Sequence, residues 1–183
     1  MVQVDKKLEF PRKRLILEET LGEGEFGRVV LGKALDLTGS GYTKVAVKML
    51  KSHYSAYELQ DLLTEYSLLK EVDHPNVIKL LGACIDKAGP ILLIMEFAEH
   101  GSLRSYLHQC RGGVSLGGGS RGEYQNRVIE NTQQLTSKDL LCFSWQVGRG
   151  MEYLSKKKVN IVKIYSICTL RALTSADANR DGL

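Results

Sequence analysis

The chain has 183 residues, of which 43% are hydrophobic and 25% charged, values that predict a soluble globular protein with room for one good-sized domain. Its formal net charge is +4, but residues 1–155 carry equal numbers of acidic and basic side chains, and the whole excess lies in residues 156–183. A short basic end segment explains this charge at least as well as nucleic-acid binding, so we expect no nucleic-acid partner.

The four cysteines are scattered, at positions 84, 110, 142 and 168. They show no C-x-x-C or His/Cys ligand spacing, so we predict neither a metal site nor a disulfide framework, and a reducing compartment. The N-terminus is polar and charged, without the pattern of a signal peptide. The best apolar run, residues 91–95, is too short to cross a bilayer. We therefore expect a soluble, cytoplasmic chain.

A glycine-rich loop organises the first third of the chain. Residues 8–33 predict two strands joined by Gly22, Gly24 and Gly27 at G-x-G-x-x-G spacing. Glycine has no Cβ, so the backbone of such a loop can approach phosphate oxygens closely. Taken alone, the spacing fits a plain tight turn about as well.

A lysine-bearing strand strengthens the phosphate interpretation. After a turn at 34–43, residues 44–50 predict a third strand that contains Val45-Ala46-Val47-Lys48. A G-x-G-x-x-G-x-V loop followed by a V-A-I-K-type strand is typical of protein kinases, and Val29 takes the last position of the loop motif. A dinucleotide-binding site is less favoured, because its motif opens a helix, whereas β-branched residues follow this loop.

Residues 57–72 change to helical period, and Ser55 is a candidate N-cap. The predicted apolar stripe consists of Leu59, Leu62, Leu63, Tyr66 and Leu69. Glu65 lies on this helix, seventeen residues after Lys48. A glutamate on an arbitrary helix faces solvent, but beside the loop and the lysine strand we favour an ion pair between Glu65 and Lys48.

The remaining elements follow from turns and periodicity. Strands are predicted at 77–81 and 91–97, a short helix at 103–109 capped by Ser102, and a helix at 136–154 capped by Thr136 or Ser137. We interpret His74, in the turn before the first of these strands, as structural. Residues 111–134 predict a flexible glycine-rich insert, and residues 159–183 lack a clear pattern. The predicted core stripe of the last helix is Leu140, Phe143, Val147, Met151 and Leu154.

Several segments together resemble a receptor-type tyrosine protein kinase, most closely the Ret type, with the fibroblast-growth-factor-receptor type as the nearest competing branch. The resemblance covers about residues 8–158. It rests on Phe10-Pro11-Arg12-Lys13, the glycine loop, residues 41–51, residues 74–84, Gly101-Ser102-Leu103-Arg104 and Gly150-Met151-Glu152-Tyr153-Leu154.

The resemblance implies an α+β fold. A kinase-like N-terminal lobe and hinge, with a five-stranded antiparallel sheet and one helix, would occupy residues 8–98. The first helices of an incomplete C-terminal lobe, with an insert at about 111–134, would occupy 99–158, and a divergent tail 159–183.

The resemblance also implies an ATP site. Gly22, Gly24 and Gly27 would cover the phosphates, with Phe26 at the loop tip. Lys48, paired with Glu65, would hold the α- and β-phosphates. The adenine would lie among Leu21, Val29 and Ala46, with Met95 as gatekeeper and the hinge backbone of Glu96 and Ala98 as its hydrogen-bonding partner.

The sequence departs from this family after Leu154. A kinase requires a His-Arg-Asp loop whose Asp accepts the substrate proton, followed by an Asn that binds Mg²⁺, and an Asp-Phe-Gly whose Asp binds Mg²⁺. The printed sequence contains neither motif; Asn179-Arg180-Asp181 comes late and lacks the histidine. The family would require Mg²⁺, but its ligands and the catalytic base are missing, so we expect no catalysis by this chain. We also expect weak ATP binding at best, because the lower wall of an ATP cleft belongs to the missing part of the C-terminal lobe.

The partners implied are ATP and, in full-length members, protein tyrosine substrates. Such members carry this domain on the cytoplasmic side of a single-pass plasma-membrane receptor. Two alternatives remain for this chain: a non-catalytic binding or decoy module that engages kinase or chaperone partners, and an inert splice or gene-model fragment.

Overall fold

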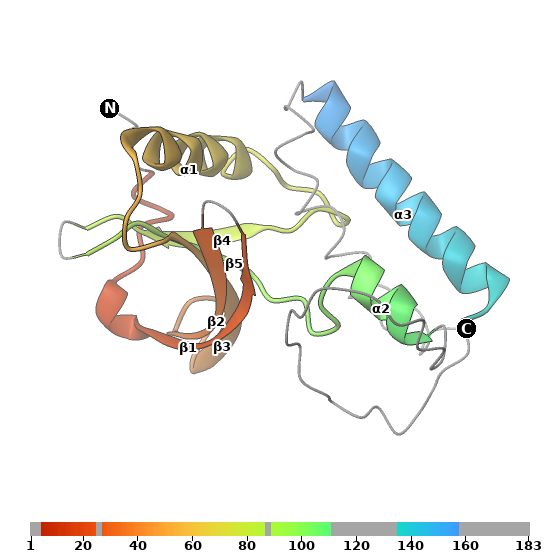
Figure 1. Cartoon of the computed structure of the whole chain (residues 1–183), viewed down its shortest axis with the longest axis horizontal. Helices are drawn as coiled ribbons and strands as arrows, with labels where there is room; N and C mark the ends of the chain where they lie inside the picture. Colours follow the sequence, from red (N-terminus) through yellow and green to blue (C-terminus); the bar gives the residue numbers. More distant parts are fainter. Residues whose placement is uncertain (1–4, 25–26, 87–88, 111–134, 158–183) are drawn as a thin grey trace.

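A curled five-stranded antiparallel sheet, flanked by one helix and continued by two more, makes up the described part of the chain (Figure 1). The computed structural model describes residues 5–24, 27–86, 89–110 and 135–157. The strands are β1 (Leu15–Glu23), β2 (Gly27–Leu35), β3 (Tyr42–Leu50), β4 (Leu80–Cys84) and β5 (Leu92–Glu96), in the spatial order β1-β2-β3-β5-β4. The helices are α1 (Ala56–Leu69), α2 (Leu103–Cys110) and α3 (Ser137–Lys156), and a 3₁₀ turn spans Arg12–Arg14. The predicted α+β architecture with five antiparallel strands is confirmed.

The sheet separates two apolar clusters, because β3 alternates between its faces. Val45, Val47 and Met49 are buried in one cluster, while Ala46 and Lys48 alternate with them on the other face. The second cluster lies between the sheet and α1 and includes side chains from α1, β4 and β5. Lys48 therefore points toward the helix side of the sheet.

The turn between β2 and β3 is shorter than predicted, and both strands are longer. It spans residues 36–41 instead of 34–43. Asp36 adopts a positive φ of 55°, donates its N–H to the carbonyl of Gly41 (2.8 Å) and accepts the Gly41 N–H on its carboxylate (3.0 Å). These two bonds close a tight loop, so the flanking residues stay paired in the ladder.

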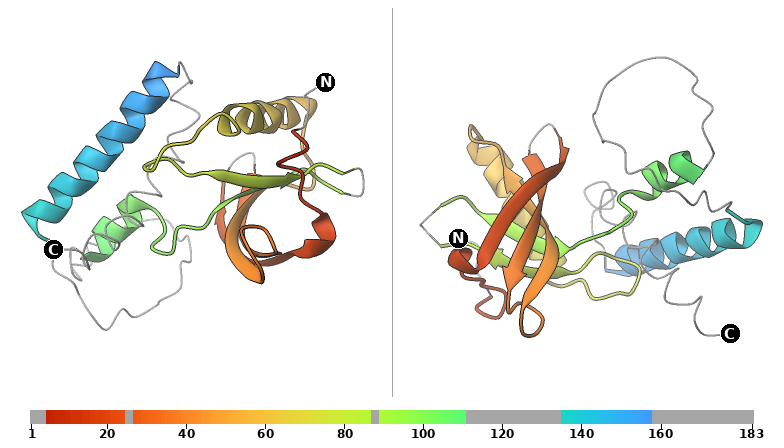
Figure 2. Two further views of the ribbon diagram at one scale, coloured as in Figure 1. Left: turned by 180° about the vertical axis from the view of Figure 1, so that it is seen from behind. Right: turned by 90° about the horizontal axis from the view of Figure 1, so that it is seen from below.

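Helix α1 begins at the predicted cap. The Ser55 hydroxyl accepts the N–H of Glu58 (3.2 Å), and the Glu58 carboxylate accepts the N–H of Ser55 (2.6 Å), which forms a capping box. The helix ends at Leu69, three residues before the predicted end, and a turn follows. Its buried face consists of Leu62, Tyr66 and Leu69, and it covers the sheet near β4 and β5 (Figure 2).

The strand predicted at 77–81 was placed too early. Residues 77–79 belong to no strand, and β4 runs from Leu80 to Cys84. Val77 and Ile78 are nevertheless almost fully buried, in the cluster that also contains Leu154 of α3. Their apolar pattern reports burial in a loop, which periodicity alone does not distinguish from burial in a strand.

Helix α3 also begins at a predicted cap, since Thr136 and Asp139 form a second capping box. Its buried face differs from the predicted stripe: Phe143 and Leu154 are buried, but Leu140 is 46% exposed, and Gln146 and Gly150 take the inward positions. A Cβ on Gly150 would lie 3.1 Å from the carbonyl oxygen of Asn76. The close approach of the loop after α1 therefore selects a glycine on this face.

Several predictions lie outside the described residues: the insert at 111–134, the tail at 159–183, Cys168 and the loop tip at Phe26. Within the described ranges, no helix has the length and apolarity required to cross a bilayer.

Candidate functional site

An ion pair between β3 and α1 forms the centre of the candidate site. The Lys48 ammonium donates to both carboxylate oxygens of Glu65, at 2.8 Å to Oε1 and 2.5 Å to Oε2. The side chains are 29% and 13% exposed. Partial burial limits competition from water, so this pair is held more firmly than an exposed surface pair. The sequence prediction that these two side chains meet is matched by this contact.

The glycine-rich loop joins β1 to β2, and β2 lies next to β3, the strand that carries Lys48. Val29 of β2 lies opposite both Gly22 of β1 and Lys48 of β3 in the two ladders. The N–H of Gly24 donates to the carbonyl of Gly27 (2.8 Å), which closes the loop. A Cβ on Gly27 would lie 2.7 Å from the carbonyl oxygen of Met49, so no larger residue fits here without a backbone shift.

A partly exposed apolar surface lies on the same face of the sheet as Lys48. Leu21, Val29 and Ala46 are each partly exposed. Ala46 lies opposite Met95 of β5, which is buried. Side chains opposite one another in an antiparallel ladder share a face, so Val29, opposite Lys48, and Ala46, opposite Met95, line the region between the glycine loop and β5. Leu21 lies on β1 at the register shift before Gly22.

The end of β5 and the segment after it make backbone hydrogen bonds next to this surface. Glu96, the last residue of β5, pairs with Lys79: its N–H donates to the Lys79 carbonyl (3.1 Å), and its carboxylate accepts the Lys79 N–H (3.0 Å). The carbonyl of Ala98 accepts the N–H of Gly101 (3.1 Å). The N–H of Ala98 makes no hydrogen bond to another described residue.

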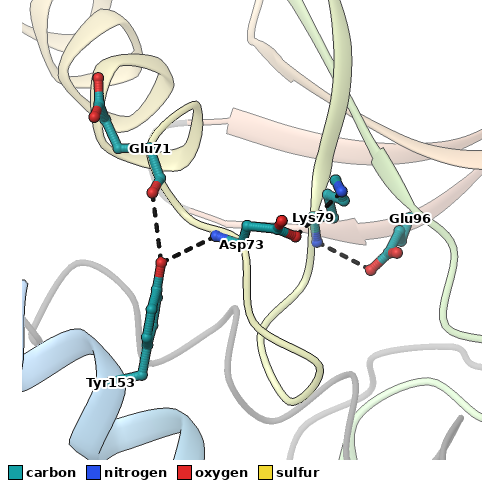
Figure 3. Close-up of polar contacts among 5 residues, drawn as sticks. All are labelled: Glu71, Asp73, Lys79, Glu96 and Tyr153. Carbon is teal, nitrogen blue, oxygen red and sulfur yellow. Dashed lines mark hydrogen bonds and ion pairs between the residues drawn. The ribbon is translucent and has the colours of Figure 1, made fainter.

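A polar network that the sequence did not reveal connects this segment to α3 (Figure 3). The hydroxyl of Tyr153 accepts the N–H of Asp73 (3.1 Å), and the Asp73 carboxylate pairs with the Lys79 ammonium (3.2 Å). Tyr153 and Asp73 are 80 residues apart. In the sequence, Tyr153 is singled out only as part of the family-like segment Met-Glu-Tyr-Leu. Nothing in that segment indicates that Asp73 is its partner.

The buried cysteine of β4 lies in the apolar cluster on the opposite face of the sheet from Lys48. Burial raises the pKa of the Cys84 thiol to about 11, so this side chain stays neutral behind the sheet. Among the described residues, no three His, Cys, Asp or Glu side chains lie together in a position to hold a metal ion.

Comparisons with known proteins place this geometry in context. The sequence model of the family described as "Protein tyrosine and serine/threonine kinase" matches residues 15–169. A fibroblast growth factor receptor of Strongylocentrotus purpuratus is 41% identical over 160 residues, which cover 86% of this chain and 16% of that protein. Fibroblast growth factor receptor 1 of Pleurodeles waltl is 44% identical over 159 residues, with 84% and 18% covered. The same receptor of Xenopus laevis is 43% identical, with 84% and 19% covered.

These matches limit what can be transferred from the relatives. The chain spans less than a fifth of the length of each of them. The matches support a fragment of a receptor tyrosine kinase. All three relatives are fibroblast growth factor receptors, the branch that the sequence indicated as the nearest alternative to the Ret type. The closer resemblance to the Ret type stays a prediction.

Proposed function

Because the chain belongs to the protein tyrosine and serine/threonine kinase family, we propose that it provides the ATP-binding half of a receptor-type tyrosine kinase domain. In longer proteins of this kind it would lie on the cytoplasmic side of the membrane, with protein tyrosines as substrates. The contact of Lys48 with Glu65, beside a glycine loop, is the observation that carries the proposal.

The phosphate end of the proposed site rests on the donors of Lys48. A lysine ammonium has three N–H donors. Two of them reach the carboxylate oxygens of Glu65, which leaves the third for a phosphate oxygen. Gly22, Gly24 and Gly27 would let the loop backbone approach the same phosphates. Glu65 thus fixes the direction of the ammonium before the nucleotide arrives.

The adenine end rests on one apolar surface and one backbone donor. Leu21, Val29 and Ala46 would contact the faces of the ring, and Met95 would close the back of the site. Adenine offers both hydrogen-bond donors and acceptors along one edge. The Ala98 N–H is available for an acceptor on that edge, and the Glu96 carbonyl would receive the exocyclic amine.

We propose further that the 183-residue chain does not transfer phosphate. Phosphoryl transfer depends on Mg²⁺ to neutralise the developing charge and on a base that orients the attacking hydroxyl. The described residues offer no cluster of carboxylates for the metal, and the sequence has neither His-Arg-Asp nor Asp-Phe-Gly. In this family the lower wall of an ATP cleft belongs to the C-terminal lobe, of which the resemblance covers only the first helices, so we expect weak nucleotide binding.

A titration tests the nucleotide site. Mg²⁺-ATP is added to the isotope-labelled 183-residue chain, and amide shifts are followed by NMR. We expect perturbations near Gly22, Lys48 and Ala98 that Lys48→Met abolishes. The matched control is Lys44→Met, which removes an exposed lysine from the same strand and should leave the titration unchanged. Equal titrations of the wild type and Lys48→Met would contradict the proposal.

A second assay tests the absence of turnover. The purified chain is incubated with Mg²⁺, radiolabelled ATP and a tyrosine-containing peptide, and we expect no labelled peptide above a control without enzyme. Transfer that is present in the wild type and lost in Lys48→Met would show that the chain is a complete kinase.

One observation favours a second candidate, a non-catalytic binding module. Leu141 and Trp145 of α3 are 71% and 62% exposed, and neighbouring exposed apolar side chains on one helix favour a protein partner. A pull-down that recovers a kinase with the wild type, but not with Leu141→Ser/Trp145→Ser, would support this candidate. Recovery of chaperones alone would leave an inert fragment as the better account.

A further inference from the structure

The chain segment before β1 crosses the edge of the sheet and is attached at three places. At its start, the N–H of Asp5 donates to the hydroxyl of Tyr66 on α1 (3.2 Å). In the middle, the Ala83 N–H donates to the Leu8 carbonyl (2.7 Å), and the Phe10 N–H donates to the Ala83 carbonyl (2.8 Å). At its end, Arg12 pairs with Asp86 (3.3 Å). The segment therefore ties α1 to the edge strand β4 and to the turn that follows it.

The side chains of this segment enter both apolar clusters of the fold. Leu8 packs against the cluster between the sheet and α1, whereas Phe10 is buried in the cluster on the opposite face. A parallel bridge between Glu9 and Ala83 lies between them. This arrangement fixes the segment to β4 independently of its contact with the helix.

A local turn prepares the contact with Tyr66. The Asp5 carboxylate accepts the N–H of Lys7 (3.0 Å), and the Asp5 carbonyl accepts the N–H of Leu8 (2.9 Å). These two bonds fix the backbone around Asp5, and its N–H is directed at the Tyr66 hydroxyl. Its partner, the Tyr66 side chain, is 0% exposed, so no bulk water competes for the tyrosine end of this bond.

Tyr66 follows Glu65 directly on α1, and the two side chains hold the helix at different points. Glu65 reaches Lys48 on β3, in the interior of the sheet, while Tyr66 reaches the segment that is fixed along β4. A rotation or translation of α1 that moved one of these side chains would move the other. Two points of attachment define the orientation of the helix better than either one alone.

We propose that residues Asp5–Arg12 form a strap that positions helix α1, and that Tyr66 acts through the strap as a positioning residue for Glu65. The strap secures the helix, and the helix holds Glu65 against Lys48. The effect on the nucleotide rests on the function proposed above, but the effect on the helix does not.

Amide hydrogen exchange and the ATP titration, both on the full 183-residue chain, test the strap. Tyr66→Phe keeps the buried ring and removes only the hydroxyl, and Asp5→Pro removes the N–H donor. We expect either variant to speed the exchange of α1 amides between residues 62 and 69 about three- to tenfold, the range expected for one hydrogen bond. The amides of β5 should change less. The double variant should behave like either single variant, because both remove the same bond.

Matched controls separate this effect from a general loss of stability. Tyr57→Phe alters a tyrosine that is 77% exposed and should leave α1 exchange nearly unchanged. Asp5→Ala keeps the N–H donor and loses only the carboxylate bond to the Lys7 N–H, so it should speed α1 exchange less than Asp5→Pro. The dissociation constant for Mg²⁺-ATP, measured well below the melting midpoint, should rise by a similar factor in Tyr66→Phe. A hydroxyl that only stabilised the core would leave that constant unchanged.

The outcomes distinguish the strap from the proposed function. Unchanged α1 exchange in Tyr66→Phe, an equal increase in α1 and β5, or additive effects in the double variant would overturn the strap. If the wild type showed no titration that depends on Lys48, the nucleotide proposal would fail, and the exchange measurement would still decide on the strap.

Discussion

The phenol ring of Tyr153 stacks on the imidazole of His74, with 4.9 Å between the ring centroids and 26° between the planes. The two residues join α3 to the turn after α1. The hydroxyl of the same tyrosine accepts the N–H of Asp73, and the His74 ring nitrogen Nδ1 accepts the N–H of Asn76 (3.1 Å). His74 therefore orders a turn and supports α3, which agrees with its structural interpretation from the sequence.

Removal of the Tyr153 hydroxyl should loosen α3. We expect Tyr153→Phe to lower the free energy of unfolding by about 0.5–1.5 kcal/mol, because the ring stacking remains while the hydroxyl no longer accepts the Asp73 N–H (3.1 Å) or donates to the Glu71 carbonyl (3.5 Å). Urea unfolding measures the change. Tyr57→Phe is the matched control, since that tyrosine is exposed and lies on α1. Equal stabilities of Tyr153→Phe and Tyr57→Phe would show that the hydroxyl contributes nothing.

Two glycine-to-alanine variants should shift stability in opposite directions. Gly27→Ala places a Cβ 2.7 Å from the Met49 carbonyl oxygen, and the strain should cost about 1–3 kcal/mol. Gly148→Ala places a Cβ in open space on α3, where alanine should stabilise the helix by roughly 0.5–1 kcal/mol. Thermal unfolding of both variants checks the signs. If Gly27→Ala left the stability unchanged, the loop backbone would be free to shift, and the small size of glycine would not be required at this position.

Local signals were sufficient for most of the fold. The residues near Ser55 and Thr136 predicted both helix starts, because a capping box is encoded within four positions. The glycine loop and the lysine strand predicted the first three strands and the pair of Lys48 with Glu65. Each of these features depends on a short pattern or on a family resemblance over a continuous segment.

Long-range contacts account for what sequence reasoning missed. Val77 and Ile78 are buried in a loop, in the cluster that also contains side chains of α1 and α3, and their apolar pattern alone predicts a strand. On α3, Gly150 faces inward where the turn at Asn76 approaches the helix closely, and Gln146 is buried on the same helix, which no periodicity in α3 itself indicates. The contact of Tyr66 with Asp5 spans 61 residues. Which residues become buried in this way depends on which distant segment packs against them, and a single sequence does not specify that packing.

The cysteines should differ sharply in reactivity. Burial holds the pKa of Cys84 at about 11, so its thiol is protonated and inaccessible at pH 8, and only a thiolate is alkylated rapidly. Cys142 is exposed on α3. Iodoacetamide at pH 8, followed by peptide mass spectrometry, should label Cys142 and spare Cys84 until urea is added. Early labelling of Cys84 would show that the sheet opens readily on the side of Phe10.

The capping box of α1 should give a defined pH dependence. Two hydrogen bonds from Ser55 lower the pKa of the Glu58 carboxyl below its ordinary value of 4.5. The larger effect comes from the Ser55 N–H and the smaller from its hydroxyl. A carboxyl with a lowered folded-state pKa contributes stability above its unfolded pKa, and this contribution is lost as the pH falls through the folded value. The stability difference between the wild type and Glu58→Gln should therefore be constant near neutral pH. It should shrink below about pH 4.5.

Urea unfolding at a series of pH values measures this difference, and groups common to both proteins cancel. Glu99→Gln, at an exposed position outside any helix or strand, is the control and should run parallel to the wild type. Ser55→Ala should cost about 1 kcal/mol at neutral pH. In the Ser55→Ala background, the pH dependence caused by Glu58 should be smaller, because the hydroxyl no longer favours the carboxylate. A Glu58→Gln difference that stayed constant down to pH 3 would show that the carboxylate does not hold the start of α1 in solution.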